Sequence, residues 1–401
     1  MKKIVFFIPF YGYPVPSVMG GGIEELMTIL LNENEGQENS EYKFYFIHKA
    51  LYGKTKKQFD QDFQLKNSEI VKIKYNRFFN TITRMFNRFL KLLKINKRFS
   101  NDYCKKSFKA INKINPDLII FEGSYDIVAR DLAKKYGKDK VLFHAHMQEP
   151  NKNLNILEYF GTIISVSNFI SNDYKNFLPN DSTINYKVLP NCVNEDRFNK
   201  KITINERIQI RKTYGFNDDS FVALYCGRIY ENKGADKLIE AVLTLDENFK
   251  VLIAGGVQSA KNETSPYLQK IANLAKKYPS KIKFTGYIKN TEMYNIYQSA
   301  DIQVVPTLCE EAAGLVVIEG QYSGLPQIVT NSGGMPEYIN NKGAIIIERD
   351  KNLVKNIAKN LKNLYDNKDL YKNMSQANLS HSKHFTKQSY YENFIKIIKE
   401  V

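Results

Sequence analysis

The chain of 401 residues is longer than one ordinary hydrophobic core can organise, and its hydrophobic content of 43% suffices for two domains of about 150–200 residues. Its four cysteines show no C-x-x-C spacing, which argues against a disulfide framework and a thiolate zinc site and fits a reducing cytoplasm. Most of the net charge of +16 arises in residues 70–113, where thirteen Lys or Arg accompany one acidic residue. This concentration predicts a confined docking surface rather than a uniformly basic, nucleic-acid-binding protein.

The first half of the chain alternates apolar runs with stretches of helical periodicity. Runs at 4–8, 44–47, 118–121, 141–143 and 163–166 predict strands. The first run follows two lysines and is broken at Pro9 with no small-residue cleavage site beyond it, so we interpret it as a core strand and not a signal peptide. No stretch approaches the roughly 20 apolar residues that a membrane-spanning helix needs.

Residues 77–98 form a candidate amphipathic helix. One arc of the helical wheel carries eight large apolar residues and the other carries six cations. The helix could pack its apolar arc into the core, or it could attach peripherally to an anionic membrane. No nucleic-acid-binding motif accompanies the charge. The apolar residues are Phe78, Phe79, Ile82, Met85, Phe86, Phe89, Leu90 and Leu93, and the cations are Arg77, Arg84, Arg88, Lys91, Lys94 and Arg98.

His144 and His146 follow the run at 141–143, and strand alternation places both rings on one face. A metal site would need a third ligand, and only Glu149 is near in sequence. We therefore favour either a partly buried histidine or a residue of a ligand cleft, and we expect no metal.

The second half repeats the alternation, with strands predicted at 221–225, 251–254, 282–284, 302–305 and 328–329. Strands that alternate with helices predict parallel sheets covered on both faces, so two series predict two Rossmann-like halves. The break falls in the Pro-, Asn- and Asp-rich stretch 190–201. Ligands of open parallel sheets bind beyond the carboxyl ends of the strands, so we expect the site in a cleft between the halves.

Glu311 and Glu319 stand eight positions apart, with Gly314 between them opening an apolar run that predicts a helix. Eight helical residues would span roughly 12 Å, which suits a nucleotide diphosphate sugar. The amides that precede the helix would favour an anion. Upstream, Arg228 and Lys233 each follow a predicted strand beside a glycine, where they could be solvated or could clamp a diphosphate.

The segment 306–326, which contains both glutamates, resembles the E-x7-E signature of glycosyltransferase family 4, whose members are retaining enzymes with the GT-B fold. Residues 225–241 are similar to the diphosphate-binding segment of that family, and residues 189–193 to its turn between domains. Residues 164–167 and 333–337 also match. Cys192, Asn194 and Ala313 depart from the pattern, and Ala313 stands where an aromatic residue is frequent, which implies an altered sugar pocket.

The resemblance implies roles for individual residues. His144 and Glu311 would be catalytic, with Glu311 also contacting the donor sugar, and Glu319 would accept hydrogen bonds from the ribose. Further donor-sugar contacts would come from Ala312, Ala313 and Gly314, and further diphosphate contacts from Arg228, Lys233, Gly21, Gly22, Gly314 and Leu315. Gly20, Gly21 and Gly22 resemble the family's first glycine-rich loop, although they do not form the G-x-G-x-x-G fingerprint. The D-x-D at Asp60–Asp62 lies in a polar stretch rather than at a strand end, so we expect no metal cofactor.

We therefore expect an α/β protein of GT-B type, with an acceptor-binding domain at 1–190, a nucleotide-sugar-binding domain at 191–385, and a helix within 386–401 that crosses back to the first domain. Its expected function is retaining transfer of a hexose-type sugar from a nucleotide diphosphate sugar to a saccharide or lipid-linked acceptor. The pathway would be bacterial cell-surface polysaccharide or glycolipid synthesis, at the cytoplasmic face of the membrane. The alternatives are a non-catalytic GT-B partner subunit and a nucleotide-sugar epimerase.

Overall fold

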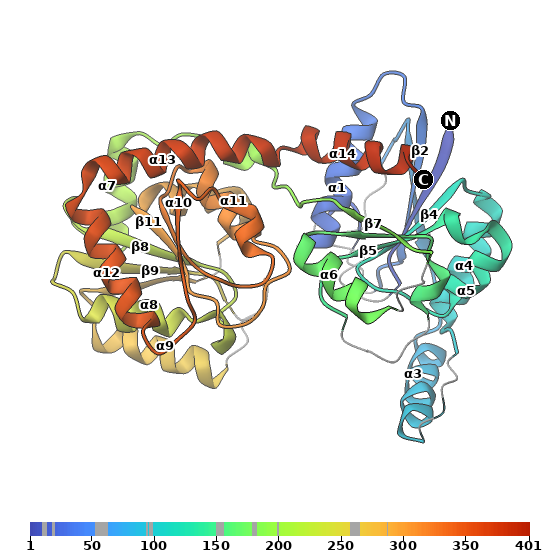
Figure 1. Ribbon diagram of the computed structural model, residues 1–401, viewed down its shortest axis with the longest axis horizontal. Coiled ribbons are helices and arrows are strands. Elements are labelled where there is room, and N and C mark those ends of the chain that lie inside the picture. Colours follow the sequence, from blue (N-terminus) through green and yellow to red (C-terminus); the bar gives the residue numbers. More distant parts are fainter. Residues whose placement is uncertain are drawn as a thin grey trace. The chain divides into compact units, whose positions relative to one another are not determined.

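The computed structural model describes residues 1–9, 14–17, 21–52, 63–93, 95, 99–149, 156–178, 183–198, 200–256, 265–286 and 288–401. They form two compact units (Figure 1). Unit 1 comprises Met1–Pro190 together with Lys387–Val401, and unit 2 comprises Asn191–Thr386. Each unit is built around one parallel sheet covered by helices, as the alternation of apolar runs and helical stretches predicts.

The sheet of unit 1 has seven described strands in the order β3-β2-β1-β4-β5-β6-β7, all parallel. The five predicted strands are confirmed, and the two at the edges, β3 and β7, were not predicted. Both edge strands carry polar and half-exposed residues, so an apolar run does not mark them. The strands are β1 (Lys2–Phe7), β2 (Tyr42–Lys49), β3 (Ser68–Ile73), β4 (Leu118–Glu122), β5 (Val141–Ala145), β6 (Thr162–Ser165) and β7 (Asn185–Val188).

Side chains that cap helix N-termini fix where several helices of unit 1 begin. The Asn101 side chain accepts a hydrogen bond from the amide of Cys104, and the Ser167 side chain accepts one from the amide of Ile170. The helices of the unit are α1 (Gly22–Glu35), α3 (Arg77–Leu92), α4 (Asp102–Ile114), α5 (Val128–Tyr136), α6 (Asn168–Phe177) and α14 (Lys387–Lys399).

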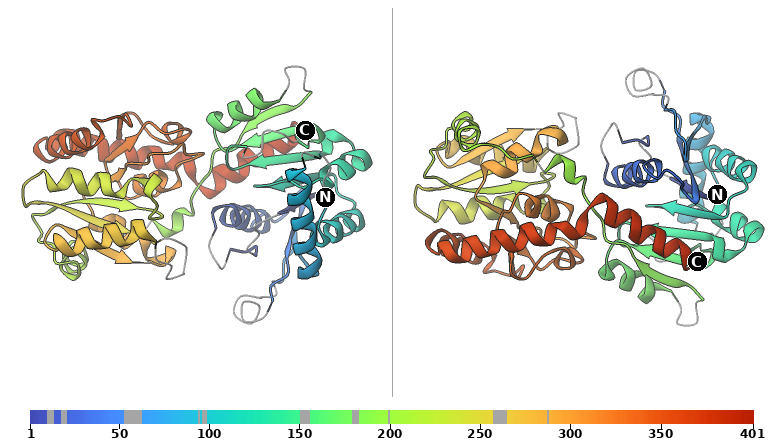
Figure 2. Two further views of the ribbon diagram at one scale, coloured as in Figure 1. Left: turned by 90° about the horizontal axis from the view of Figure 1, so that it is seen from below. Right: turned by 90° about the horizontal axis from the view of Figure 1, so that it is seen from above.

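The helix α14 belongs to unit 1 although it is far along the chain from the rest of that unit. It packs against α1, and both views of Figure 2 show the red final helix lying against unit 1. The Phe394 ring centroid lies 5.5 Å from that of Phe6 and 6.0 Å from that of Phe44. The hydroxyl of Tyr391 donates to Asn34 Oδ1 at 3.0 Å. The helix therefore completes one face of the unit 1 core.

The helix α3 does not pack its apolar arc into the core, so the interpretation of residues 77–98 as a core helix is wrong. Figure 1 shows α3 extending away from the sheet of unit 1. Phe78 is 68% exposed and Met85 is 63% exposed, whereas Leu90 is buried. The helix ends at Leu92, and Lys94 and Arg98 lie outside the described residues. The other exposed apolar residues of this segment are Phe79, Ile82, Phe86, Phe89, Leu92, Leu93, Ile95 and Phe99.

The sheet of unit 2 has six described strands in the order β10-β9-β8-β11-β12-β13, again all parallel. Five of them were predicted, and β13 was not. The strands are β8 (Phe221–Cys226), β9 (Phe249–Ala254), β10 (Ile282–Gly286), β11 (Ile302–Val305), β12 (Gln327–Thr330) and β13 (Ala344–Ile347). Apolar clusters cover both faces of this sheet. In both units the strand order reverses beside the first strand, and ligands of such sheets bind at that point, beyond the carboxyl ends.

The helices of unit 2 are α7 (Ile204–Thr213), α8 (Ala235–Leu243), α9 (Pro266–Lys277), α10 (Met293–Ser299), α11 (Leu315–Tyr322), α12 (Leu353–Asp366) and α13 (Lys368–Ser382). Thr203 and Glu206 form a capping box at α7, and Ser265 caps α9 immediately before Pro266. Across the described residues of both units, the helices are all too short or too polar to cross a lipid bilayer.

Candidate functional site

Two glycine turns shape the carboxyl ends of β8 and β9. The amide of Gly227 donates to the carbonyl of Ala254, and the amide of Ile229 donates to that of Gly256. Gly255 has a φ of 142°, and a Cβ at this position would lie 1.9 Å from the carbonyl oxygen of Gly227. Only glycine therefore lets the two strand ends approach this closely.

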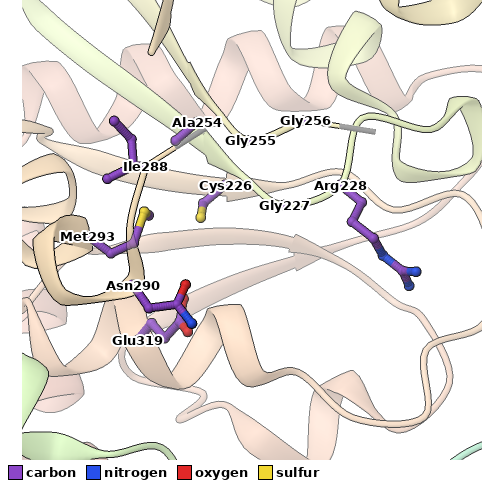
Figure 3. Close-up of a pocket in the computed structure, with 10 residues that line it drawn as sticks. All are labelled: Cys226, Gly227, Arg228, Ala254, Gly255, Gly256, Ile288, Asn290, Met293 and Glu319. Carbon is purple, nitrogen blue, oxygen red and sulfur yellow. The ribbon is translucent and has the colours of Figure 1, made fainter. Parts of the chain in front are cut away.

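The space beyond these turns is a pocket of about 200 Å³. Backbone from two strand ends forms one side, and side chains from α10, α11 and the turn before α10 form the other (Figure 3). Its lining is Cys226, Gly227, Arg228, Ala254, Gly255, Gly256, Ile288, Asn290, Met293 and Glu319. The pocket combines exposed backbone, one carboxylate, one guanidinium and one amide with apolar side chains, a mixture that is typical of small-molecule binding sites.

Glu319 reaches this pocket because buried polar side chains of the sheet hold α11. Gln303 on β11 donates to the carbonyl of Val316, and Gln327 on β12 donates to the carbonyl of Val317, each at 2.8 Å. The hydroxyl of Tyr297 donates to Glu319 Oε2 at 2.6 Å. These contacts fix the helix and orient the carboxylate.

Burial and the nearby charge of Glu319 raise the pKa of the Cys226 thiol to about 12, so this side chain is an uncharged thiol at neutral pH.

Lys233 and Glu311 are 78 positions apart in sequence, yet they form an ion pair between Nζ and Oε1. Lys233 is the last residue of a short 3₁₀ helix, Glu231–Lys233, and Gly234 follows it with a φ of 69°. A Cβ on Gly234 would lie 2.1 Å from the carbonyl oxygen of Pro306, so this glycine lets the lysine turn pack against the end of β11. The hydroxyl of Thr307 also donates to Glu311, at 3.2 Å.

The structure confirms a helix that begins after Gly314 and corrects only the expected span between the two glutamates. The helix α11 begins at Leu315 with Gly314 as its N-cap, so only the part of the interval from Leu315 to Glu319 is helical. Glu311 lies in the preceding loop beside Ala312 and Ala313. The roughly 12 Å span expected for eight helical residues therefore does not apply.

Arg228 lies on the rim of the same region. Its carbonyl accepts a hydrogen bond from the hydroxyl of Tyr225 at 2.8 Å, and its guanidinium lies 5.6 Å from the ring centroid of Tyr230. In Figure 3 its side chain extends away from Cys226. Among the described residues, no carboxylate forms an ion pair with Arg228, so its charge is available to a ligand anion.

Unit 1 carries a second polar cluster at the carboxyl ends of β4 and β5. Glu122 ends β4 and is the register partner of His144 on β5. Glu122 Oε2 lies 3.0 Å from His144 Nδ1 and 3.1 Å from His146 Nε2. The prediction that both rings share a face is confirmed, because their centroids are 4.1 Å apart. The only described set of residues with metal-ligating geometry is this one, with its ligand atoms within 4.8 Å of one another.

Sequence reasoning missed Glu122, and Glu149, which was noted only as the nearest candidate in sequence, is not a member of this cluster. Glu149 instead accepts a hydrogen bond from the Tyr125 hydroxyl at 2.5 Å. Burial favours a neutral Glu122, but the attraction of His144 and hydrogen bonds from both imidazoles outweigh it and lower the pKa of Glu122 to about 2. Burial and repulsion from His144 lower the pKa of His146 to about 4, despite the attraction of Glu122. At neutral pH the cluster therefore contains an ionised carboxylate and a neutral His146.

Gly21 and Gly22 lie at the beginning of α1, close to this cluster. The next residue, Ile23, packs closely on Gly123. A Cβ added to Gly123 would lie 2.3 Å from Ile23 Cδ1. Gly123 directly follows Glu122, so the glycine turn and the histidines share one end of the sheet. Gly20 and the D-x-D at Asp60–Asp62 lie outside the described residues.

Comparison with known proteins finds a match over the larger part of unit 2. Residues 206–381 match the family model of glycosyl transferases group 1. We call residues 206–381 the group 1 segment. It contains Arg228, Lys233, Glu311 and Glu319, whereas Glu122, His144 and His146 lie outside it.

Individual relatives agree with the group 1 match. The chain is 27% identical over 209 residues to the lipopolysaccharide 1,2-N-acetylglucosaminetransferase of Salmonella typhimurium, which covers 51% of this chain and 52% of that protein. It is 27% identical over 234 residues to the GDP-mannose-dependent monoacylated alpha-(1-6)-phosphatidylinositol monomannoside mannosyltransferase of Corynebacterium glutamicum, covering 54% and 58%. The chain spans about half the length of the curated relatives it matches.

A solved structure extends the similarity to the whole fold. The crystal structure of Anabaena HepE in complex with UDP has a TM-score of 0.74 and covers 100% of both chains at 13% sequence identity. This likeness and the two parallel sheets identify the fold as GT-B, so the predicted fold class is confirmed.

Proposed function

We propose that this chain is a retaining glycosyltransferase that moves a sugar from a nucleotide diphosphate sugar to an acceptor hydroxyl. The observation that carries the proposal is the Lys233–Glu311 ion pair together with the pocket lined by Arg228 and Glu319, all within residues 206–381. Lys233 already contacts Glu311, so a diphosphate bound by Lys233 would hold its sugar beside that carboxylate. The same group 1 segment would thus bind nucleotide, diphosphate and sugar in succession.

Each predicted residue then has a chemical task. Glu319 lines the pocket and would accept hydrogen bonds from the ribose hydroxyls. Arg228 and Lys233 would stabilise the charge that develops on the leaving diphosphate, with the amides of Gly314 and Leu315 at the start of α11 supporting it. Glu311, with the loop at Ala312 and Ala313, would bind the donor sugar. Gly21, Gly22 and His144 of unit 1 would act at the phosphate and the sugar.

The acceptor that we propose is a saccharide or a lipid-linked saccharide at an anionic membrane surface, as in bacterial polysaccharide or glycolipid synthesis. Support comes from the exposed apolar residues and the arginines of α3. Two relatives that are named for lipid or lipopolysaccharide acceptors point the same way.

The experiment that tests the proposal uses the purified chain, a panel of nucleotide sugars and simple acceptors. Donor binding should raise the melting temperature by mass action, and the product of an α-linked donor should be α-linked when its anomeric configuration is read by NMR. A β-linked product would contradict retention. Absence of both stabilisation and transfer across the panel would contradict the proposed activity.

We expect transfer to need no divalent cation, because Arg228 and Lys233 supply the positive charge at the diphosphate. Turnover should persist after dialysis against excess chelator. Loss of turnover that manganese or magnesium restores would show that a metal ion takes this role instead.

We expect substitution of Glu319 and of Glu311 to affect different steps, nucleotide binding and sugar transfer respectively. Glu319→Ala should weaken binding of the bare nucleotide diphosphate, because the ribose contact is lost. Glu311→Ala should leave nucleotide affinity nearly unchanged and impair transfer. Calorimetry with the nucleotide measures its affinity, and the transfer assay measures the rate of sugar transfer. Glu310→Ala is the matched control, since Glu310 is exposed and pairs with Arg349. Equal loss of nucleotide affinity in both variants would refute this division of roles.

A further inference from the structure

Lys49 is the last residue of β2, so it lies at the carboxyl edge of the unit 1 sheet, where ligands of such folds bind. Its ammonium lies 5.1 Å from the ring centroid of Tyr103 on α4 and 5.9 Å from that of Tyr75, which follows β3. Tyr103 is buried, and its hydroxyl donates to the carbonyl of Ile8 at 2.9 Å. The two tyrosine rings pack edge to face with their centroids 5.8 Å apart. They therefore hold the ammonium at a defined place beside the strand ends.

The two rings position the Lys49 ammonium but do not neutralise its charge, because an aromatic ring carries no ionised group. Burial is the main reason that the pKa of Lys49 is lowered. Cys104 opposes this effect, and the positive charge of Arg84 on α3 adds to it. Two neighbouring cations repel each other, and an anion bound by both relieves this repulsion. A phosphate group can do so because it accepts charge-assisted hydrogen bonds from both lysine and arginine.

The segment that packs around Lys49 carries far more positive than negative charge. Residues 70–113, which include α3 and α4, hold thirteen Lys or Arg and one acidic residue, Asp102. Asp102 already pairs with Lys106 at 2.9 Å and accepts a hydrogen bond from the amide of Asn76 at 2.7 Å. The segment therefore cannot balance its own charge, and the excess is complementary to an anionic ligand.

The helix α3 also presents apolar side chains to solvent beside its arginines, among them Phe78 and Met85. The side chain of Asn80 on α3 accepts a hydrogen bond from the amide of Tyr103 at 3.2 Å, which fixes the base of this helix beside the Lys49 site. Cations next to exposed apolar surface fit an amphiphile, whose phosphate lies beside its acyl chains, better than a free phosphate ion.

We propose that Lys49 and Arg84 bind the phosphate group of a lipid, and that this lipid carries the acceptor hydroxyl. The first part rests on unit 1 alone, and the second part rests on the proposed function. The site differs from a general attraction of α3 to an anionic surface, because Lys49 is held at the edge of the sheet and would contact one phosphate group.

The first test measures binding of dihexanoyl phosphatidic acid, a short-chain lipid that stays monomeric in dilute solution, to the full chain by calorimetry. Lys49→Gln should weaken the affinity roughly tenfold or more, because a charge-assisted contact to the phosphate is lost. Lys49→Arg keeps the charge and should retain most of the affinity. The matched control is Lys43→Gln, which should bind like the wild type. Lys43 lies on the same side of β2 at the opposite end of the sheet, where its ammonium donates to the carbonyl of Lys66 at 2.8 Å.

A second pair of variants tests Arg84, whose side chain is exposed, so that its substitution does not disturb the core. Arg84→Gln should weaken binding of the same lipid roughly threefold or more, a smaller effect than at Lys49 because solvent screens an exposed charge. Arg88→Gln, one turn further along α3, should change the affinity little. Equal affinities of the Arg84→Gln and Arg88→Gln variants would remove Arg84 from the site.

The other outcomes decide the remaining parts of the proposal. Equal affinity of Lys49→Gln and Lys43→Gln for the lipid would overturn the role of Lys49. Inorganic phosphate that binds as tightly as the lipid would overturn the lipid assignment, and dihexanoylglycerol that binds as tightly would overturn recognition of the phosphate.

These binding measurements do not need sugar transfer, so they are separate from the proposed function. Absence of transfer by the wild-type chain would contradict the proposed function and leave the phosphate site standing. Where transfer is observed, Lys49→Gln should raise KM for a phosphate-bearing lipid acceptor roughly tenfold without changing donor affinity. An unchanged KM for that acceptor would overturn the statement that the bound lipid carries the acceptor hydroxyl.

Discussion

Replacing Lys233 or Arg228 by alanine should lower turnover roughly tenfold or more while the chain stays folded. Each side chain would face the charge that grows on the leaving diphosphate, and loss of one such contact in a closed site removes about 2–4 kcal/mol of transition-state stabilisation. The measurement is steady-state kinetics with the best donor of the panel. Lys237→Ala is the matched control, because Lys237 pairs with Glu240 on α8.

The ion pair with Glu311 needs its own control, since Lys233→Ala leaves that carboxylate without its cation. A double-mutant cycle with Glu311→Ala separates the two effects. If Lys233 served only to neutralise Glu311, the double variant would be no slower than Glu311→Ala alone. We expect it to be slower, because the diphosphate loses its cation as well. Turnover equal to the wild type in Lys233→Ala and Arg228→Ala would refute the diphosphate assignment.

Replacing Arg77, Arg84 and Arg88 on α3 by glutamine should strongly reduce binding to anionic vesicles and leave thermal stability nearly unchanged. Each cation near an anionic surface contributes roughly 1 kcal/mol, so three of them correspond to a loss in partitioning on the order of a hundredfold. Cosedimentation with vesicles measures the binding. Raised salt should weaken wild-type binding in the same way, because it screens exposed charges.

The matched control for this prediction replaces three exposed lysines of unit 2, Lys355, Lys359 and Lys372, by glutamine. The net charge then changes equally, but α3 is intact, so vesicle binding should persist. Truncating Phe78 and Met85 should also weaken binding without lowering the melting temperature, because both side chains are exposed. Equal binding by the α3 variant and the control, or binding that salt does not affect, would contradict a membrane contact through α3.

Apolar patterns in the sequence predict the central strands of each sheet but not most of the edge strands. Central strands such as β1 and β8 are apolar runs because both faces are covered, so they were predictable. The edge strand β3 has exposed and half-exposed positions that include Glu69 and Lys72, and its pattern does not distinguish it from a loop. Helical periodicity likewise predicted α3 but could not decide whether its apolar arc faces the core or solvent.

The candidate site could be predicted only in part, because some of its residues are far apart in sequence. Glu311 and Glu319 stand in one recognisable motif, whereas the partner of Glu311 is 78 positions away. Glu122 lies 22 positions before His144, and only the parallel pairing of β4 with β5 brings the two side chains together. A buried carboxylate at the end of an apolar strand was the available signal, because ionisable residues are seldom fully buried without a partner.

The place of α14 has a consequence for how the chain folds as it is synthesised. Unit 2 is inserted between Pro190 and Lys387, so a ribosome makes all of it before α14 appears. At about 5–20 residues per second, that delay is roughly 10–40 seconds. During this time the aromatic surface of Phe6 and Phe44 lacks the cover of Phe394, while unit 2 is already complete. The nascent chain therefore exposes apolar surface of unit 1 until α14 is made, and such exposed surface favours aggregation.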